Sequence, residues 1–276
     1  MRFESRSFWL AKDTEMPQCY EDAFCLDAER GAAAIADGVS EGIFSGAWAR
    51  ILTQTTVSDP PNLDNPEEFQ AWLARQRAAW AEQIDTSRLA WYQRPKLIDG
   101  GMSTLLWVTL HPSDGQPNAV PGSYCLESFA IGDCCLFHMR GGQLVRSFPL
   151  QSAAEFDLTP GMIGSVDQKR DHLLEFQSVV DVCVPGDLLV LCTDALAKWA
   201  LGQSEAGTPV NWERYWEMPV ESWQEEIAAL RHDRQLRYDD TTLLLLRVVE
   251  ETAAPVEILT EVIEAAEVET AKENGT

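Results

Sequence analysis

Positive charge is scarce in this sequence. The 276 residues include 21 Lys and Arg against 44 Asp and Glu, which gives a formal net charge of -23. A field of this sign repels nucleic acid and anionic membrane surfaces, so neither is an expected partner. It also repels phosphorylated substrates unless bound cations invert the local potential. A phosphate-binding site in this chain would therefore need such cations.

Long apolar runs and metal-binding cysteine patterns are also missing. No stretch approaches the roughly 20 apolar residues of a membrane span, and charges interrupt the first 13 residues, where a secretory signal would be apolar. The seven cysteines form no CxxC pair, and the four histidines show no metal-ligand spacing. These absences argue against a zinc site and predict reduced, buried thiols in a cytoplasmic protein.

Helical and strand-like stretches are both present, without an internal repeat. The pattern predicts helices over 43–56, 65–84 and 222–231, the second with the Asn-Pro-Glu-Glu start that is typical of a helix N-terminus. Strand-like runs cover 32–36, 103–110, 124–138, 144–148, 179–184, 188–192 and 242–249. Many strands with a few long helices predict an α+β fold, in which helices lie outside packed sheets.

The composition changes after residue 250. The segment 251–276 is rich in Glu, Ala and Thr, and four aliphatic residues between 258 and 263 are spaced for one short amphipathic helix. We therefore predict one domain over residues 1–250 and an acidic C-terminal tail over 251–276. A frayed end with a helical turn and a partner-docking element remain the two alternatives for this tail.

Apolar runs in this chain repeatedly meet an aspartate. AAAIADG ends on Asp37 and Gly38, SFAIGD on Asp133 and DLLVLCTD on Asp194, while Asp239 and Asp240 stand just before TTLLLLRVV. In antiparallel pairing one strand's end lies beside its neighbour's beginning, so these carboxylates can gather at one rim of a sheet. Unit charges ~4 Å apart repel by roughly 4 kcal/mol at an effective dielectric of ~20, so the group requires protonation or cations. Oxygen ligands of this kind favour an Mg²⁺ or Mn²⁺ site over independent strand caps.

Six blocks of the sequence also occur in a familiar order. From about Cys19 to Val249 they are YEDAF, AAAIADGVSEG, GGMSTLLWV, SFAIGDCCLF, PGDLLVLCTDAL and RYDDTTLLLL. Together they resemble the protein phosphatase 2C (metal-dependent serine/threonine phosphatase) family, and QSAAEFDLTPGMIGS resembles a segment of its bacterial branch. The resemblance implies a four-layer α-β-β-α sandwich of two mostly antiparallel sheets flanked by helices. It also implies two Mn²⁺ or Mg²⁺ ions at one end, with a third, weaker site.

The resemblance assigns metal-binding roles to residues of these blocks. Asp37 would bridge both ions, and the carbonyl of Gly38 would bind one of them. Asp194 and Asp240 would complete the sites, and Asp240 is preferred to its neighbour Asp239 because the apolar strand starts two residues after it.

Three further acidic residues have implied roles around these ligands. Glu21 and Asp22 would hold metal-bound waters, and Asp133 matches the position of the third metal site. The block at 101–104 is expected to pack closely near the site, since a strand glycine often marks a tight backbone approach.

The implied activity is that of a phosphoric monoester hydrolase in signalling. A hydroxide bridging the two ions would attack the phosphorus of phosphoserine or phosphothreonine, with no protein nucleophile. The ions and their waters would bind the phosphoryl oxygens. The partners would be a phosphorylated protein substrate and a cognate serine/threonine kinase.

Some positions depart from the family pattern. No arginine stands shortly before Glu21 and Asp22, where many relatives use one to grip the substrate phosphate, and Lys12 is a more distant cation without the bidentate fork. Lys198 stands where many relatives have an acidic residue. On a helix it would lie one turn after Asp194, so it is a candidate phosphate contact, with an ordinary exposed lysine as the alternative.

Three functions remain open on the sequence alone. An active metal-dependent phosphatase is favoured by Asp37, Asp194 and Asp240. A catalytically weak or inactive phosphatase-like binding module (a pseudophosphatase) is favoured by the missing arginine and by Lys198. A two-metal nuclease would also use clustered carboxylates, but the acidic balance opposes binding to nucleic acid.

Overall fold

The computed structural model of the chain describes residues 2–40, 42–91, 93–113, 122–157, 160–167 and 174–250. The predicted acidic tail, residues 251–276, lies outside these ranges. None of the helices within them is both long and apolar enough to span a membrane.

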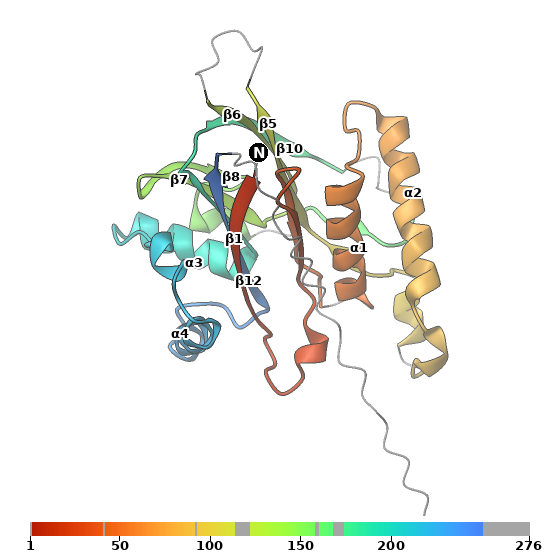
Figure 1. Cartoon of the computed structure of the whole chain (residues 1–276). Coiled ribbons are helices and arrows are strands. Elements are labelled where there is room, and N and C mark those ends of the chain that lie inside the picture. Colours follow the sequence, from red (N-terminus) through yellow and green to blue (C-terminus); the bar gives the residue numbers. More distant parts are fainter. Residues whose placement is uncertain are drawn as a thin grey trace, which may run out of the picture.

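Five antiparallel strands form the first sheet (Figure 1). In spatial order they are β1 (Arg2–Leu10), β12 (Thr241–Val249), β11 (Leu188–Cys192), β7 (Cys135–Arg140) and β8 (Gln143–Phe148). The register sets Leu10 opposite Thr241 and Cys192 opposite Leu243. The last residues of β1 and β11 therefore lie beside the first residues of β12.

Five more antiparallel strands form the second sheet. In spatial order they are β10 (Gln177–Cys183), β6 (Tyr124–Ile131), β5 (Leu105–Pro112), β3 (Ala32–Ala36) and β2 (Ala23–Asp27). Here Ala23 lies opposite Ala36, and Leu105 lies opposite Ile131. The start of β2, the end of β3 and the end of β6 consequently meet at one edge. A two-stranded ladder, β4 (Met102–Ser103) with β9 (Ile163–Gly164), adjoins the sheets.

Side chains of β3 alternate between two cores. Ala33 and Ile35 pack in the core between the two sheets, whereas Ala34 and Ala36 pack against the fully buried Trp48. Both faces of this strand are thus apolar and buried, which explains its unbroken run of small apolar residues.

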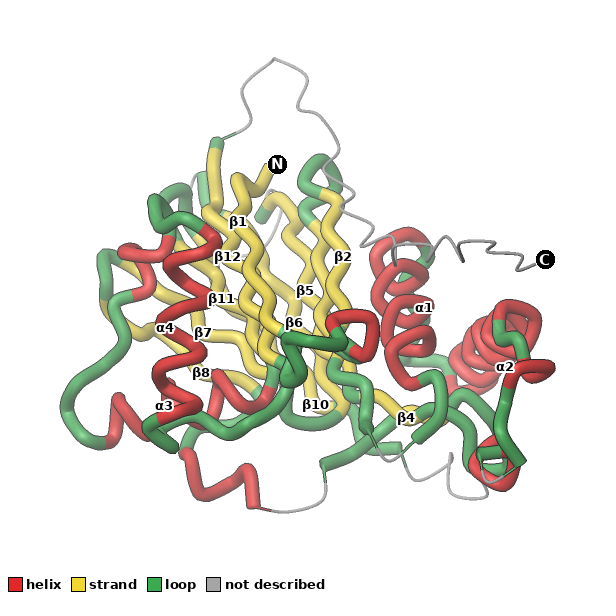
Figure 2. Tube along the Cα trace, turned by 90° about the horizontal axis from the view of Figure 1, so that it is seen from below, coloured by secondary structure: helices red, strands yellow, loops and turns green. Residues whose placement is uncertain are grey.

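Two helices cover the outer face of the second sheet, α1 (Ser45–Ser58) and α2 (Pro66–Gln83) (Figure 2). The side chain of Asn65 accepts the backbone N–H groups of Glu67 and Glu68, and Pro66 occupies the first helical position. This is the predicted N-terminus, in which the cap satisfies two otherwise unpaired donors.

Two other helices cover the outer face of the first sheet, α3 (Asp194–Glu205) and α4 (Val220–His232). The rings of Phe8 on β1 and Trp223 on α4 lie 5.4 Å apart, centroid to centroid. Ile227 and Leu196 join the same core. The 3-10 helices are η1 (Pro17–Cys19), η2 (Thr86–Arg88), η3 (Arg94–Leu97), η4 (Ala153–Asp157) and η6 (Trp212–Tyr215).

The predicted four-layer α-β-β-α arrangement is confirmed, with one core between the sheets and one under each helical layer. The predicted single run over 124–138 is wrong, because β6 and β7 are separate strands in different sheets. The chain breaks at Gly132, whose φ of +97° is a left-handed conformation that favours glycine. Strands β1, β2 and β9 and helix α3 were not among the predicted elements.

Candidate metal centre

The carboxylates predicted from the sequence meet at one end of the sandwich. Asp22 precedes β2, Asp37 follows β3 and Asp133 follows β6, all at one end of the second sheet. Asp194 follows β11 and Asp240 precedes β12 at the corresponding end of the first sheet. We refer to these five residues together with Asp239 as the acidic rim.

Asp22 is the most deeply buried member of the acidic rim, with 2% of its surface exposed. Its Oδ2 accepts hydrogen bonds from the hydroxyls of Thr193, at 3.0 Å, and Thr242, at 2.6 Å. Its Oδ1 is buried and has no hydrogen-bond partner among the described residues. Burial raises the pKa of Asp22 well above its usual value, the Thr242 hydroxyl opposes this, and Asp240 and Asp194 raise it further.

Asp37 is held through its backbone. Its N–H donates to the Thr104 hydroxyl at 3.1 Å, and its carbonyl accepts the Thr104 N–H at 3.0 Å and the Ser103 hydroxyl at 2.9 Å. Burial raises the pKa of the Asp37 carboxyl well above its usual value, and the charges of Asp22 and Asp194 add to the effect. The carboxylate is therefore positioned by neutral groups while facing other acids.

Gly38 packs directly on the segment that carries Glu21. A Cβ at this position would lie 2.5 Å from the carbonyl oxygen of Glu21 and 3.0 Å from that of Ser45. Gly101 is similarly tight, since a Cβ there would lie 3.0 Å from the carbonyl oxygen of Ile43. Close packing of the block at 101–104 beside the site is thus confirmed.

Asp194 is the first residue of α3, where the helix dipole favours a negative charge. Its Oδ2 accepts from Nη2 of Arg237, while its buried Oδ1 has no partner in the described part of the chain. Burial raises the pKa of Asp194, the positive charge of Arg237 opposes this, and Asp239 adds to it. Burial and then Asp194 raise the pKa of Asp133 to about 6.

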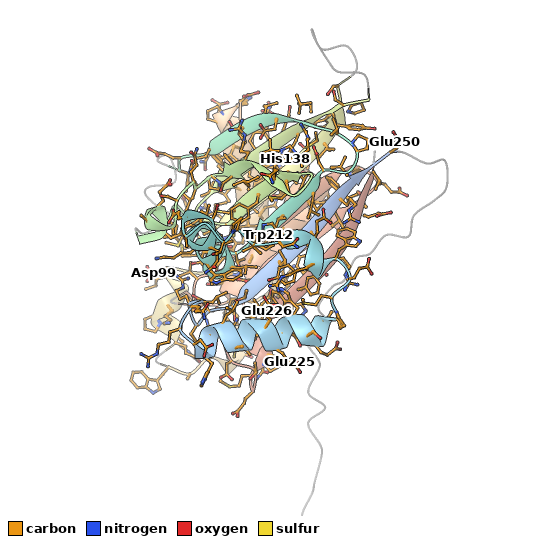
Figure 3. All side chains as sticks on the ribbon, turned by 90° about the vertical axis from the view of Figure 1, so that its left-hand side faces the viewer. Asp99, His138, Trp212, Glu225, Glu226 and Glu250 are labelled. Atoms are coloured by element: carbon orange, nitrogen blue, oxygen red, sulfur yellow. The ribbon has the colours of Figure 1, made fainter. Side chains whose placement is uncertain are left out.

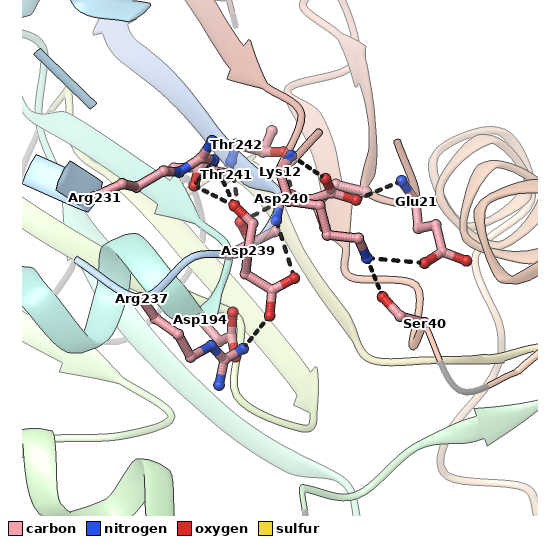
Figure 4. A network of polar contacts seen from close by, with 12 residues as sticks. Lys12, Glu21, Ser40, Asp194, Arg231, Arg237, Asp239, Asp240, Thr241 and Thr242 are labelled. Atoms are coloured by element: carbon pink, nitrogen blue, oxygen red, sulfur yellow. Dashed lines mark hydrogen bonds and ion pairs between the residues drawn. The ribbon is translucent and has the colours of Figure 1, made fainter. Parts of the chain in front are cut away.

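Asp239 and Asp240 point in different directions (Figure 4). The two carboxylate oxygens of Asp240 accept the backbone N–H groups of Lys12, at 2.7 Å, and Glu21, at 2.8 Å. Asp239 instead accepts from Arg237 at 2.8 Å. The charge of Asp239 is among those that raise the pKa values of Asp37, Asp133 and Asp194. Asp239 therefore acts on Asp37, Asp133 and Asp194, whereas Asp240 acts on Asp22.

Several solved structures that resemble this chain are phosphatases. The Mycobacterium tuberculosis serine/threonine phosphatase PstP/Ppp superimposes with a TM-score of 0.55 at 17% sequence identity, covering 91% of this chain and 100% of its own. The photosystem II phosphatase PBCP gives 0.55 at 17%, covering 89% and 98%. PppA, a regulatory component of the type VI secretion system in Pseudomonas aeruginosa, gives 0.54 at 19%, covering 90% and 98%. The chain has the protein phosphatase 2C fold.

This likeness confirms, at the level of the fold, the resemblance seen in the sequence blocks. No family model matches the sequence, and no match was found among curated proteins. The phosphatase 2C fold is therefore established by three-dimensional structure at low sequence identity.

Arg237 is the member of the site that the sequence reasoning missed. Its Nη2 donates to the carboxylates of both Asp194 and Asp239, and about half of its side chain is exposed. Burial lowers the pKa of Arg237, but Asp194 and Asp239 outweigh this, and the pKa is raised. The available signal was an arginine two residues before the aspartate pair in RYDD.

The predicted basic candidates lie at different places on the phosphatase 2C fold. The ammonium group of Lys12 pairs with Glu21, at 3.4 Å, and donates to the Ser40 hydroxyl. Lys198 lies on α3, one turn after Asp194, and is half-buried. Its contact with phosphate stays a prediction.

A second group of buried polar residues comes from β7 in the first sheet, the end of β10 in the second sheet and the turn before β11. His138 (Figure 3), Cys183 and Asp187 have possible ligand atoms within 4.8 Å of one another. Asp187, however, already accepts from His138 Nε2 at 2.9 Å, from the Val184 N–H at 2.9 Å and from two nitrogens of Arg140 at 2.8 and 2.7 Å. These donors occupy both carboxylate oxygens, and the guanidinium already neutralises the charge. The carboxylate of Asp187 is thus fully hydrogen-bonded, which disfavours an added cation there, although the buried Nδ1 of His138 has no partner among the described residues.

Proposed function

We propose that the chain is a metal-dependent protein serine/threonine phosphatase. The observation that carries the proposal is the pair of buried carboxylate oxygens, Asp22 Oδ1 and Asp194 Oδ1, without partners among the described residues. They belong to a rim whose members raise one another's pKa values. Divalent cations would supply both the missing partners and the missing positive charge, and an all-oxygen donor set suits Mn²⁺ or Mg²⁺.

The ligands we propose are Asp37, Asp194 and Asp239, with the carbonyl of Gly38. The sequence expectation placed Asp240 among them. The two backbone N–H groups on the oxygens of Asp240, and the effect of Asp239 on the pKa values of three other acids of the rim, favour Asp239 instead. Asp240 then anchors the chain at Lys12 and Glu21 to the start of β12.

The surrounding acids take outer positions in this proposal. Asp22, oriented by two threonine hydroxyls, and Glu21 would accept hydrogen bonds from water at the ions. Asp133, at the edge of the rim, would provide the third, weaker site. When bound, the ions supply Lewis acidity and a nucleophile derived from water at neutral pH.

The substrate we propose is a phosphoserine or phosphothreonine in a protein, added there by a cognate kinase in the cytoplasm. This proposal is supported by the likeness in fold to a serine/threonine phosphatase and to a photosystem II phosphatase. The buried thiols Cys134 and Cys192 are poor candidates for a nucleophile, because burial raises their pKa values, and the proposal uses no protein nucleophile.

A binding module without turnover is the second candidate. It is favoured by Arg237, which already engages two of the proposed ligands. A pseudophosphatase of this kind would retain the carboxylates, but Asp194 and Asp239 would stay paired with Arg237 in place of a metal ion.

One assay separates the two candidates. Hydrolysis of p-nitrophenyl phosphate and of a phosphothreonine peptide would be followed with and without Mn²⁺, in the wild type and in Asp37→Asn. Asp59→Asn is a matched control, because Asp59 pairs with Arg75 on the surface, outside the acidic rim. We expect Mn²⁺-dependent turnover in the wild type and the control only. Stabilisation by Mn²⁺ without turnover of either substrate would favour the binding module.

A further inference from the structure

A positively charged side chain, in addition to the proposed metal ions, would strengthen the binding of a phosphate ester at the acidic rim. A phosphate dianion approaching it meets Asp133, Asp194 and Asp239 in a protein of net charge -23. The segment between Lys12 and Glu21, DTEMPQCY, contains no Arg or Lys. A positively charged phosphate ligand must therefore come from another part of the chain.

Arg231 is unsuited to this role. Its guanidinium donates to the carbonyls of Leu10 and Ala11, each at 2.9 Å, to the Asp239 carbonyl and to the Thr241 hydroxyl, at 2.8 Å. These neutral acceptors belong to two segments, the end of β1 and the start of β12, and the donor lies on α4. Arg231 is thus a structural tie between β1, α4 and β12.

Lys12 is similarly committed. Its ammonium group pairs with Glu21 and donates to Ser40. An ammonium also lacks the planar fork that binds two oxygens of one phosphate. This leaves Arg237 as the arginine at the rim whose recorded partners are all carboxylates.

Arg237 combines exposure with a replaceable set of partners. About half of its side chain is exposed, and only Nη2 of its guanidinium has partners among the described residues. Those partners are the carboxylates of Asp194 and Asp239, two of the proposed metal ligands. A divalent ion that takes these oxygens removes the charges that hold the arginine.

We propose that Arg237 binds the substrate phosphate once metal ions have displaced it from Asp194 and Asp239. The inference rests on the proposed function and adds a residue to it. In the metal-free protein the guanidinium compensates the two carboxylates. In the loaded protein it is left beside cations, where only an anion such as phosphate makes its position favourable. Arg237 therefore competes with the metal and cooperates with the phosphate.

The test measures two affinities and needs no turnover. Mn²⁺ binding to the metal-free protein and inorganic phosphate binding to the Mn²⁺-loaded protein would be followed by calorimetry, in the wild type, Arg237→Gln and Arg237→Lys. Arg75→Gln is the control, since Arg75 pairs with Asp59 on the surface of α2. Circular dichroism of each metal-free variant establishes that it is folded.

We expect Arg237→Gln to bind Mn²⁺ several-fold more tightly and phosphate on the order of tenfold more weakly, because hydrogen bonds to charged groups are the stronger class. Arg237→Lys should keep the competition with Mn²⁺ but lose part of the phosphate affinity. Arg75→Gln should change neither constant.

The outcomes distinguish a failure of this inference from a failure of the proposed phosphatase function. A wild type that binds no Mn²⁺ overturns the proposed function and this inference with it. Tight Mn²⁺ binding with equal phosphate affinity in wild type and Arg237→Gln overturns the inference alone. Unchanged or weaker Mn²⁺ binding in Arg237→Gln overturns the competition and so the displacement on which the inference depends.

Discussion

Asp187 and Asp22 are both almost fully buried, yet their pKa values move in opposite directions. Burial alone would raise the pKa of Asp187, but hydrogen bonds from Arg140 and His138 outweigh it, and the pKa falls well below its usual value. Asp22 receives only two neutral hydroxyls, and its pKa rises. The difference lies in the donors that surround each carboxylate.

The comparison separates two uses of a buried charge. Around Asp187 the fold supplies cationic and neutral donors to the carboxylate, so both of its oxygens are hydrogen-bonded within the protein. Around Asp22 and Asp194 the fold leaves an oxygen unpaired and adds further carboxylates. Complete groups of this kind stabilise structure, whereas incomplete ones indicate a missing partner.

The largest effect should come from breaking the complete group. Asp187→Ala leaves His138 and Arg140 without their acceptor, and we expect it to lower the free energy of unfolding by about 3 kcal/mol, as for other broken buried pairs. Asp22→Asn should leave the stability of the metal-free protein unchanged or raise it. Urea unfolding of both variants, without metal, makes the measurement. Equal destabilisation by the two changes would contradict the comparison.

Metal should complete the acidic rim. At a free Mn²⁺ concentration of ~100 times the dissociation constant, the wild type should gain about 2.7 kcal/mol in the free energy of unfolding. Asp37→Asn should lose this gain, because a proposed bridging ligand is removed, and should be no less stable than wild type without metal. Thermal unfolding with and without Mn²⁺ tests both statements, and a gain retained in Asp37→Asn would argue against the ligand assignment.

The pH dependence of stability should differ between the two groups. Because the pKa values of Asp22, Asp37 and Asp133 are raised in the folded state, the folded metal-free protein binds more protons than the unfolded chain. Stability should therefore rise as the pH falls from about 7.5 through 6, near the pKa of Asp133, toward 5.

Below about pH 4 the trend should reverse. The depressed pKa of Asp187 means that the stabilisation from this group is present at higher pH and is lost as the solution becomes more acidic. Melting temperatures of the metal-free protein from pH 3.5 to 7.5 would show a maximum between these limits. A steady rise toward pH 7.5 would show that the carboxylates of the rim are not destabilising when charged.

The smallest effect concerns a charge beside the rim. Lys198→Ala should change the free energy of unfolding by less than about 0.5 kcal/mol, as for most surface substitutions. If Lys198 contacts phosphate, the variant should nevertheless raise the Michaelis constant for p-nitrophenyl phosphate. An unchanged Michaelis constant would show that Lys198 does not contact phosphate.

Much of the architecture follows from local pattern. Helices α1, α2 and α4 and most strands follow from residue spacing and from the cap at Asn65. The sequence pattern did not predict β1, because polar residues interrupt its apolar residues and because its apolar side chains pack on both faces of the first sheet. Phe3 packs between the sheets, whereas Phe8 and Leu10 pack under α4. Sequence alternation indicates a strand best when only one face is buried.

The gathering of carboxylates was also predictable, because antiparallel strands exchange ends. The directions of Asp239 and Asp240 were not, since adjacent residues differ here only through their tertiary donors. The amides that bind Asp240 come from Lys12 and Glu21, more than 200 residues earlier in the chain. The hydrogen bonding of Asp187 was not predictable either, because His138 and Arg140, which donate to it, lie on β7, earlier in the chain.

The hydrogen bonds from the backbone of Lys12 and Glu21 to Asp240 have a consequence for folding during synthesis. The hydrogen bond from Lys12 to Asp240 closes a loop of 228 residues, and the only described neighbour of β1 is β12, the last of the described strands. Contacts so distant in sequence form late, because the entropy of closing the loop must be offset first. A nascent chain that stops before residue 239 has most strands of both sheets but lacks two rim carboxylates and the anchor for residues 12–21. Metal binding at the proposed site would then require a chain that extends past residue 240, so fragments that stop earlier should be unable to compete for the ion.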